Sequence, residues 1–189
     1  MDEITIRAAR PGDARSIARL DVDTWRSTYA GILTGTYLVG LSPERRQQGW
    51  ANVIGREPRD VRVAVDAEDR ILGFGSCGKC RAEPGFNGEV FTLYVDPDRH
   101  NCGIGRRLLL ALFARLVAQG CGSVIVWVLQ DNPARFFYER LGGVLVWRKQ
   151  FTVGGKTIQA LGYGWRDLPG YLAAMAGADG SPDPEQTDP

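Results

Sequence analysis

The sequence has few of the residues that commonly hold metals or form disulfides, because its 189 residues include four cysteines and a single histidine. A structural zinc site usually needs two close pairs of Cys or His ligands. Cys77 and Cys80 could form one such pair, but Cys102 and Cys121 lie 19 residues apart and do not form another. We therefore expect no bound metal and interpret the cysteines as reduced thiols, with a metal-binding regulator as a remote alternative.

Long hydrophobic runs and an excess of one charge are also absent. No stretch approaches the ~18 apolar residues that a membrane-spanning helix needs, and residues 1–17 lack the apolar centre of a secretory signal peptide. With 23 Lys and Arg against 22 Asp and Glu, the formal net charge is +1. No overall field therefore favours nucleic acid or an anionic membrane as a partner. We expect a cytoplasmic protein that binds neither.

The composition is otherwise that of an ordinary globular protein, with 44% hydrophobic and 24% charged residues. The length indicates one domain, which we assign to residues 1–170, followed by a C-terminal tail at 171–189. After about residue 177 the tail is acidic and rich in proline, and it has almost no apolar side chains. Such a composition is typical of disordered segments, so we predict disorder there.

Hydrophobic periodicity and turn residues predict a series of strands and helices. Residues 124–129 are continuously apolar, as expected of a strand that is covered on both faces. Residues 103–119 have the clearest helical pattern, and Gly120 ends it. The other predicted strands are 5–7, 61–65, 71–76, 89–95, 144–153 and 157–165, and the other predicted helices are 14–29, 43–54 and 133–141. This order indicates an α/β domain around a mixed sheet.

The strand at 89–95 leads into a loop whose glycines, Gly103 and Gly105, lie where the long helix begins. Glycines let several backbone N–H groups converge, and a helix N-terminus carries about half a positive charge. Three arginines add formal charge nearby: Arg99, Arg106 and Arg107. The loop therefore predicts a site for a phosphorylated ligand.

Two common phosphate-binding motifs do not fit this loop. The NTPase loop needs Gly, four residues, Gly-Lys and then Ser or Thr, whereas Gly103-Ile-Gly-Arg-Arg has neither the lysine nor the hydroxyl. The dinucleotide fingerprint needs a third glycine where this sequence has Leu108, and it follows its strand directly. Seven residues separate Val95 from Gly103. Both interpretations fail.

The loop instead resembles the GNAT superfamily of acyl-CoA-dependent N-acyltransferases, whose signature is Gln/Arg-x-x-Gly-x-Gly/Ala after a strand. The matching segment runs from His100 to Gly105, and His100 stands where Gln or Arg is usual. A second family motif, an Asn shortly before Phe-Tyr-Glu-x-Leu-Gly, resembles the segment from Asn132 to Gly142. Two motifs in the family's order make the resemblance specific, and it extends over about residues 61–165.

The resemblance implies a mixed, mostly antiparallel sheet, splayed between its fourth and fifth strands and flanked by helices on both faces. It also implies acetyl-CoA as co-substrate, with the pantetheine arm in the splayed region and the pyrophosphate at the loop. The residues that it assigns to acetyl-CoA are Leu93, Tyr94, Val95, His100, Asn101, Cys102, Gly103, Ile104, Gly105, Arg106 and Asn132. The backbone of the first three is expected to pair with the pantetheine.

Acetyl transfer to an amine needs a base and an acid. An alkylammonium group has a pKa near 10.4, so it must lose a proton before it attacks, and the departing thiolate must gain one. The resemblance implies Tyr138 as the general acid and Glu89 as the general base. Other candidates for the base are a water chain or one of three acidic residues, Asp96, Asp98 and Glu83.

The acceptor amine is not identified by the sequence. The resemblance suggests that Trp25, Tyr29 and Trp50, on the first two long helices, line its pocket, with core packing as the equal alternative for each. The balanced charge is compatible with a polyamine, an aminoglycoside, an amino acid, a peptide N-terminus or a lysine side chain. We expect an N-acetyltransferase that acts on a small-molecule or protein amine, with a homodimer as one option. A GNAT-fold module that binds acyl-CoA without turnover is the alternative.

Overall fold

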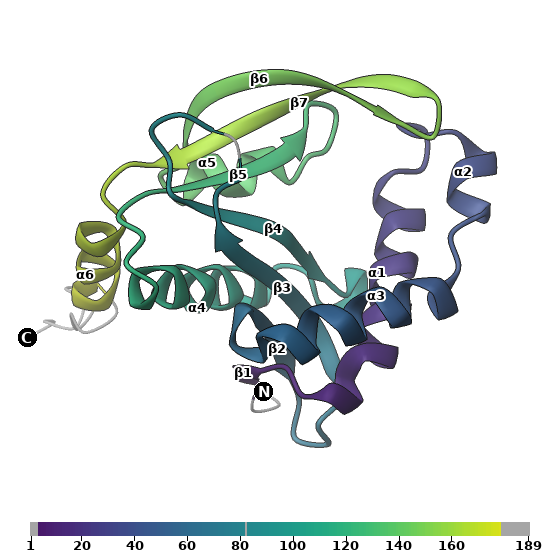
Figure 1. Cartoon of the computed structure of the whole chain (residues 1–189), viewed down its shortest axis with the longest axis horizontal. Helices are drawn as coiled ribbons and strands as arrows, with labels where there is room; N and C mark the ends of the chain where they lie inside the picture. The colour runs from purple at the N-terminus through teal and green to yellow at the C-terminus, as the bar shows by residue number, and fades with distance from the viewer. Residues whose placement is uncertain (1–3, 82, 179–189) are drawn as a thin grey trace, which may run out of the picture.

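The computed structural model describes residues 4–81 and 83–178, in which seven strands form one sheet in the order β1-β2-β3-β4-β5-β7-β6 (Figure 1). The strands are β1 (Thr5–Ala8), β2 (Val61–Val65), β3 (Ile71–Lys79), β4 (Gly88–Val95), β5 (Val124–Leu129), β6 (Val144–Val153) and β7 (Lys156–Trp165). All neighbours are antiparallel except β4 and β5, which are parallel. The pairing of β4 with β5 spans only Gly88–Val90 and Val124–Val126, after which the two strands diverge. The predicted splayed, mostly antiparallel sheet is confirmed.

Helices cover both faces of this sheet. On one face, α1 (Ala14–Thr28) and α3 (Pro43–Arg56) bury Ile17 and Ile54 in a cluster with Phe74 of β3. On the other face, α4 (Ile104–Ala118) packs its apolar side against the middle strands. The shorter helices are α2 (Gly35–Val39), α5 (Arg135–Arg140) and α6 (Leu168–Ala178), and the 3-10 turns are η1 (Pro11–Asp13), η2 (Pro58–Asp60) and η3 (Pro97–Arg99).

Local sequence explains where the long helices begin and end. The Ser42 hydroxyl accepts a hydrogen bond from the backbone N–H of Arg45, and Pro43 occupies the first turn of α3. Gly103 precedes α4 with φ +74°, and Gly120 follows it with φ +82°. Residues with a Cβ rarely adopt these left-handed conformations, so the two glycines define the ends of α4.

The predicted strands and helices are present, with ends that differ by a few residues. Two helices were not predicted: α2, and α6, which begins in the assigned domain and runs into the segment assigned to the tail. In α6, Leu168 is buried and Tyr171 packs against Trp165 of β7. Disorder was predicted after about residue 177, and the residues from 179 onward lie outside the described part of the chain. The domain limits remain a prediction.

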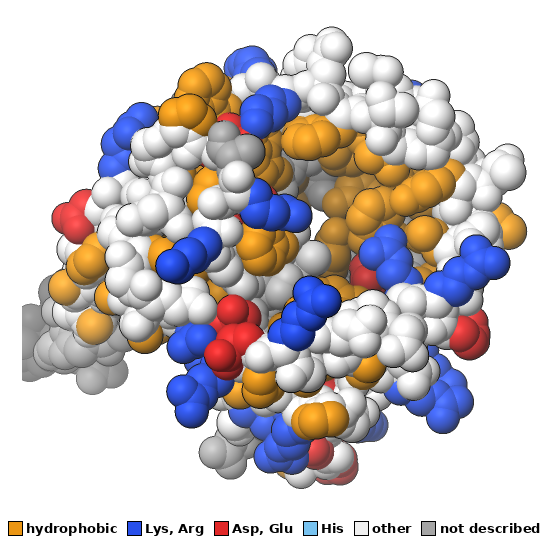
Figure 2. Space-filling model, viewed as in Figure 1, with side chains coloured by type: hydrophobic (Ala, Val, Ile, Leu, Met, Phe, Trp, Pro, Cys, Tyr) orange, Lys and Arg blue, Asp and Glu red, His pale blue; other side chains and the backbone are white. Residues whose placement is uncertain are grey.

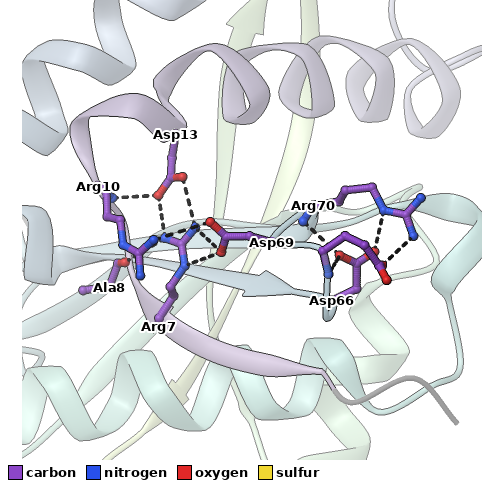
Figure 3. A network of polar contacts seen from close by, with 8 residues as sticks. Arg7, Ala8, Arg10, Asp13, Asp66, Asp69 and Arg70 are labelled. Carbon is purple, nitrogen blue, oxygen red and sulfur yellow. Dashed lines mark hydrogen bonds and ion pairs between the residues drawn. The ribbon is translucent and has the colours of Figure 1, made fainter.

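A polar network holds the N-terminal edge of the sheet together (Figure 3). Arg7 of β1 donates hydrogen bonds to Asp13 in η1 (2.7 Å) and to Asp69 in the β2–β3 turn (2.9 Å). In the same turn, the Asp66 carboxylate accepts hydrogen bonds from the backbone N–H (2.9 Å) and the guanidinium (2.7 Å) of Arg70. These contacts fix β1 and the β2–β3 turn at the sheet edge opposite to β6.

Residues 4–81 and 83–178 contain neither a membrane-spanning helix nor a cluster of metal-binding side chains. No helix in these ranges is both long and apolar enough to cross a bilayer. Their His, Cys, Asp and Glu side chains form no group of three or more that could hold a metal ion. Cys77 and Cys121 are buried thiols, Cys80 is half-buried and Cys102 is exposed.

Candidate functional site

The central feature is the splayed region where the ends of β4 and β5 diverge, here called the cleft. A bulge at Phe91 bends β4, because Ser76 of β3 lies opposite Thr92 while the next residue, Cys77, lies opposite Val90. The bend comes directly after the last residue that pairs with β5. Beyond it, β4 has β3 as its only neighbouring strand among the described residues, so one backbone edge of β4 faces the cleft.

The direction of the backbone groups in β4 follows from one hydrogen bond. The N–H of Asp96 donates to the carbonyl of Leu72 in β3 (2.9 Å). Alternate residues of an antiparallel strand direct their backbone groups to the same side. The backbone groups of Tyr94 therefore face β3, whereas those of Leu93 and Val95 face the cleft. Two of the three strand residues that the sequence assigned to acetyl-CoA thus expose main-chain donors and acceptors there.

The predicted phosphate loop leads from β4 through η3 to α4. Asn101 and Gly103 both have positive φ, at 62° and 74°, so the chain turns sharply ahead of the helix. The first hydrogen bond of α4 runs from the N–H of Arg107 to the carbonyl of Gly103 (3.1 Å). The N–H groups of Ile104 and Gly105 consequently have no acceptor inside the helix. This helix end is suited to an anion such as a pyrophosphate.

Close packing lies behind this loop. A Cβ added at Gly105 would lie 3.4 Å from the ring of Phe137 in α5, and a Cβ at Gly103 would meet nothing within 4 Å. The Arg106 guanidinium donates to the sulfur of Met175 in α6 (3.9 Å). Asn101 and Cys102 are exposed in the loop. The cradle is therefore open toward solvent and backed by α5, as a bound pyrophosphate requires.

His100 turns back toward the strand instead of outward. Its Nε2 lies 3.1 Å from the carbonyl oxygen of Val95. This contact engages one of the cleft-facing backbone groups of β4. The expected contact of His100 with phosphate therefore requires a different ring orientation from the one in the structure.

A group of polar side chains, two buried and one half-buried, lies at the open end of the cleft. Asn132 is buried, and its side-chain oxygen accepts a hydrogen bond from the N–H of Ala134 (2.9 Å), just before α5. Burial raises the pKa of Tyr29, while hydrogen-bond interactions with Tyr94 and Asn132 oppose that rise. Burial also raises the pKa of Tyr94 well above its usual value. The tertiary structure thus brings together α1, β4 and the β5–α5 loop.

Tyr138, the predicted general acid, lies beside this group. It is 5% exposed and stacks on Tyr163 of β7, with ring centroids 6.2 Å apart. Burial, and secondarily the proximity of Tyr29, raise the pKa of the Tyr138 phenol. The hydroxyl of Tyr163 instead donates a hydrogen bond to Glu139. Tyr138 is therefore a protonated phenol at neutral pH.

Glu89, the predicted general base, lies at the closed end of the cleft, opposite Ile125 of β5. It is 7% exposed, and its carboxylate is paired with the guanidinium of Arg81 (3.0 Å). Arg81 also lies over the Phe91 ring, 4.5 Å from its centroid. The structure does not pair Glu89 with Tyr138, and a base at this position must first lose its arginine partner.

Two of the three acidic alternatives, Glu83 and Asp96, are also engaged. Glu83 forms an ion pair with Lys149 of β6. Asp96 accepts a hydrogen bond from the N–H of Asp98 (3.0 Å) at the start of η3. Glu83 and Asp96 therefore already have local structural roles.

A hollow of about 480 Å³, its open mouth included, adjoins the cleft. Its walls carry four aromatic residues from α1, β5 and β6, together with five aliphatic ones. The aromatic residues are Trp25, Tyr29, Trp127 and Phe151. The tip of the β6–β7 hairpin lies against α2, since a Cβ at Gly154 would lie 2.6 Å from the Tyr37 ring. The sequence therefore pointed to two of these aromatic residues and missed the two on the strands.

Trp50, the third aromatic residue considered for the pocket, is a core residue. It packs edge-on against Phe74 (5.1 Å between centroids), and its indole N–H donates to Asp21 (3.0 Å). Asp21 was missed by the sequence analysis. It is 1% exposed, one of its oxygens has no partner, and burial raises its pKa. One sequence feature could have indicated that Asp21 is buried: it lies on the apolar stripe of α1, four residues from both Ile17 and Trp25.

Comparison with known proteins follows the same segments. A family model described as "Acetyltransferase (GNAT) family" matches residues 19–143. The chain is 34% identical over 166 residues to the uncharacterized N-acetyltransferase YuaI of Bacillus subtilis, covering 87% of this chain and 94% of that protein. It is 38% identical over 142 residues to a mycothiol acetyltransferase of Saccharopolyspora erythraea, covering 73% of this chain but 43% of that protein. The chain thus spans less than half the length of that relative.

Solved structures share the fold at low sequence identity. The yncA acetyltransferase of Salmonella typhimurium, solved with acetyl-CoA, has a TM-score of 0.66 at 18% identity, covering 98% of this chain and 99% of that one. The paia N-acetyltransferase of Thermoplasma acidophilum, solved with coenzyme A, has a TM-score of 0.63 at 21% identity, covering 84% and 98%. At these identities the likeness concerns the fold alone.

Proposed function

Because this chain belongs to the GNAT family of acetyltransferases, and is therefore an acetyl-CoA-dependent N-acetyltransferase, we propose that it transfers acetyl directly to a primary amine of a small molecule. The observation that carries this proposal is the open cleft between β4 and β5, with an anion-binding helix end at α4 and a buried phenol, Tyr138, beside its open end. A small-molecule acceptor is supported by relatives named for mycothiol and for L-methionine sulfoximine.

The residues present fit acetyl-CoA as the co-substrate. The N–H groups at the start of α4 would hold the pyrophosphate, and the cleft-facing backbone of Leu93 and Val95 would pair with the pantetheine amides. Asn132, at the mouth of the cleft, would contact the same arm. Acetyl-CoA supplies a thioester, whose carbonyl carbon accepts the amine and whose sulfur leaves as a thiolate.

We assign proton donation to Tyr138. A thiolate whose conjugate acid has a pKa near 8.5 is easier to expel when a proton or hydrogen bond meets it. The Tyr138 phenol is protonated at neutral pH, as a general acid must be, although burial raises its pKa and so makes it a weaker acid than an exposed tyrosine. Direct transfer of this kind needs no Cys or Ser nucleophile, in keeping with cysteines that are buried or lie in loops and at a strand end.

Tyr138→Phe tests this assignment. The ring and its packing remain, but the proton is lost, so kcat should fall by ~10² to 10⁴-fold with a smaller effect on KM for acetyl-CoA. Tyr163→Phe is the matched control, because Tyr163 is a buried tyrosine stacked on Tyr138 whose hydroxyl bonds to Glu139. Coenzyme A release over a panel of amines is the measurement. Wild-type turnover by Tyr138→Phe would refute the assignment.

We propose Glu89 as the base, acting through water after Arg81 moves aside. Glu89→Gln should then reduce kcat/KM most at low pH, where the acceptor is most fully protonated. Arg81→Gln removes the partner but leaves the carboxylate, so it should retain activity. Equal losses in both variants would instead mean that the ion pair is structural and that water alone takes the proton.

The second candidate function is an acyl-CoA-binding module without turnover. The engagement of Glu89 by Arg81 favours it, because the site then lacks a ready base. Calorimetric binding of acetyl-CoA with no coenzyme A release over the whole amine panel would support the module. Release with any one amine would exclude it.

A further inference from the structure

The chemistry of the hollow beside the cleft restricts the acceptor. Its walls contain no charged side chain: four are aromatic, and five are aliphatic residues from the α1–α2 loop, β5, β6 and β7. Figure 2 shows apolar side chains gathered in the hollowed region between the β6–β7 hairpin and α1. A second ammonium or a cluster of hydroxyls placed there would lose its water without gaining a partner, which is costly. An apolar group gains from the same burial.

Aromatic walls can also bind cations, so a cationic ligand group must be considered beside an uncharged one. Arg46 lies 5.1 Å from the centroid of the Trp25 ring, and Lys149 lies 5.1 Å from that of Trp127. Each cation already interacts with the π system of its ring, so that interaction is taken before a ligand cation arrives. Arg46 and Lys149 are held there by Asp21 (3.3 Å) and Glu83 respectively. The hollow is therefore suited to an uncharged group.

Tyr29 connects the hollow to the reaction centre. Its ring forms part of the wall, and its hydroxyl interacts with Tyr94 and Asn132 at the open end of the cleft. It also influences the pKa of Tyr138. A ligand whose apolar group fills the hollow can thus present its amine to the side where Tyr138 lies.

We propose that the acceptor is a primary amine bearing an uncharged aromatic or branched aliphatic group, which the hollow binds between Trp25 and Tyr29 on one side and Trp127 and Phe151 on the other. This inference rests on the proposed transfer to a small-molecule amine. It excludes polyamines and aminoglycosides as preferred acceptors.

The test compares primary amines of similar size. 2-Phenylethylamine and 3-methylbutylamine represent the proposed class, and putrescine, glucosamine and L-methionine sulfone represent polar alternatives. Coenzyme A release gives kcat/KM for each, and calorimetry gives the affinity of each for the complex of the protein with coenzyme A. The apolar amines should exceed the polar ones at least tenfold in both, which corresponds to about 1.4 kcal/mol.

Two substitutions on β6 distinguish binding in the hollow from general effects of losing an aromatic side chain on this strand. Phe151→Ala should lower both quantities about tenfold for 2-phenylethylamine and leave those for putrescine unchanged. Trp147→Ala is the matched control, because Trp147 lies on the same strand with nearly the same exposure, 40% against 41%, but does not line the hollow. Phe151→Asp should reverse the preference toward putrescine, whose second ammonium the carboxylate can pair.

The outcomes distinguish the two proposals. If no amine releases coenzyme A while acetyl-CoA binds, the proposed transfer fails, and the calorimetric preference still decides the inference about the hollow. The inference is overturned if putrescine, glucosamine or methionine sulfone equals the apolar amines, or if Trp147→Ala causes the same loss as Phe151→Ala.

Discussion

At the scale of single residues, Asp21 illustrates how far a side chain depends on its environment. It is a carboxylate at 1% exposure with a Trp50 N–H at 3.0 Å, Arg46 at 3.3 Å and one oxygen without a partner. Loss of hydration is the largest influence and raises its pKa, while the interactions with Trp50 and Arg46 oppose that rise. Removal from water thus outweighs an incomplete set of partners.

This balance predicts how stability depends on pH. Because the folded pKa of Asp21 is raised, the folded state holds its proton where the unfolded chain has already lost it. The contribution of Asp21 to the free energy of unfolding should therefore fall as pH rises from about 4, the usual range of an aspartate, through the raised pKa. Asp21→Asn should be more stable than wild type at neutral pH and should flatten this dependence.

Urea denaturation at a series of pH values measures the effect. Asp23→Asn is the control, because Asp23 is an exposed carboxylate on the same helix. The interpretation of Asp21 is wrong if both variants change the pH dependence of stability alike. It is also wrong if Asp21→Asn loses as much free energy of unfolding between pH 4 and neutral pH as the wild-type protein does.

At the scale of elements, the start of α4 combines a turn with positive φ, a helix end and a close neighbour. The chain turns at Asn101 and Gly103, and Gly105 approaches Phe137 so closely that a Cβ would lie 3.4 Å away. No single one of these features is sufficient for a strong anion site. Together they present converging backbone N–H groups to an open cradle.

Gly105→Glu should remove acetyl-CoA binding while preserving the fold. A carboxylate in the first turn is favourable for the helix dipole, so α4 should still form. The same charge and bulk oppose a pyrophosphate, so the affinity should fall at least tenfold, or about 1.4 kcal/mol, in calorimetry. Gly49→Glu makes the same change at an exposed, open position in α3 and should bind normally. Normal binding by Gly105→Glu would locate the pyrophosphate elsewhere.

At the scale of the whole molecule, the sheet consists of two parts joined by little backbone pairing. Among residues 4–81 and 83–178, strands β1–β4 meet β5–β7–β6 through three residue pairs at the closed end of the cleft. Helices α4 and α5 pack together across this junction through a shared apolar cluster. A ligand held by both edges of the cleft therefore binds a surface that only the folded chain presents.

Acetyl-CoA should consequently stabilise the protein against unfolding. At ~100 times its dissociation constant, linkage adds about 2.7 kcal/mol to the free energy of unfolding. Thermal and urea denaturation measure this gain, with Gly105→Glu as the variant that should lose it. A melting curve that ignores acetyl-CoA but shifts with NADH or ATP would contradict the site.

The sequence alone determined the features that depend on short windows of chain. Alternating and continuous apolar patterns located the seven strands, and the glycines at 103, 105 and 120 located the phosphate loop and the end of α4. The helix α2 escaped because five residues cannot display a helical period.

The tertiary structure decided which side chains meet. Trp50 belongs to the core while Phe151, more than a hundred residues later, faces Trp25 and Tyr29 across the hollow. Arg81 is paired with Glu89, and Asp21 is buried by α3, because strand register and helix packing bring these residues together. Contacts between distant residues depend on how whole elements pack and leave no periodic signal in the local sequence. The residues that we propose to bind the acceptor could therefore be found only from the way α1, β5 and β6 pack around the hollow.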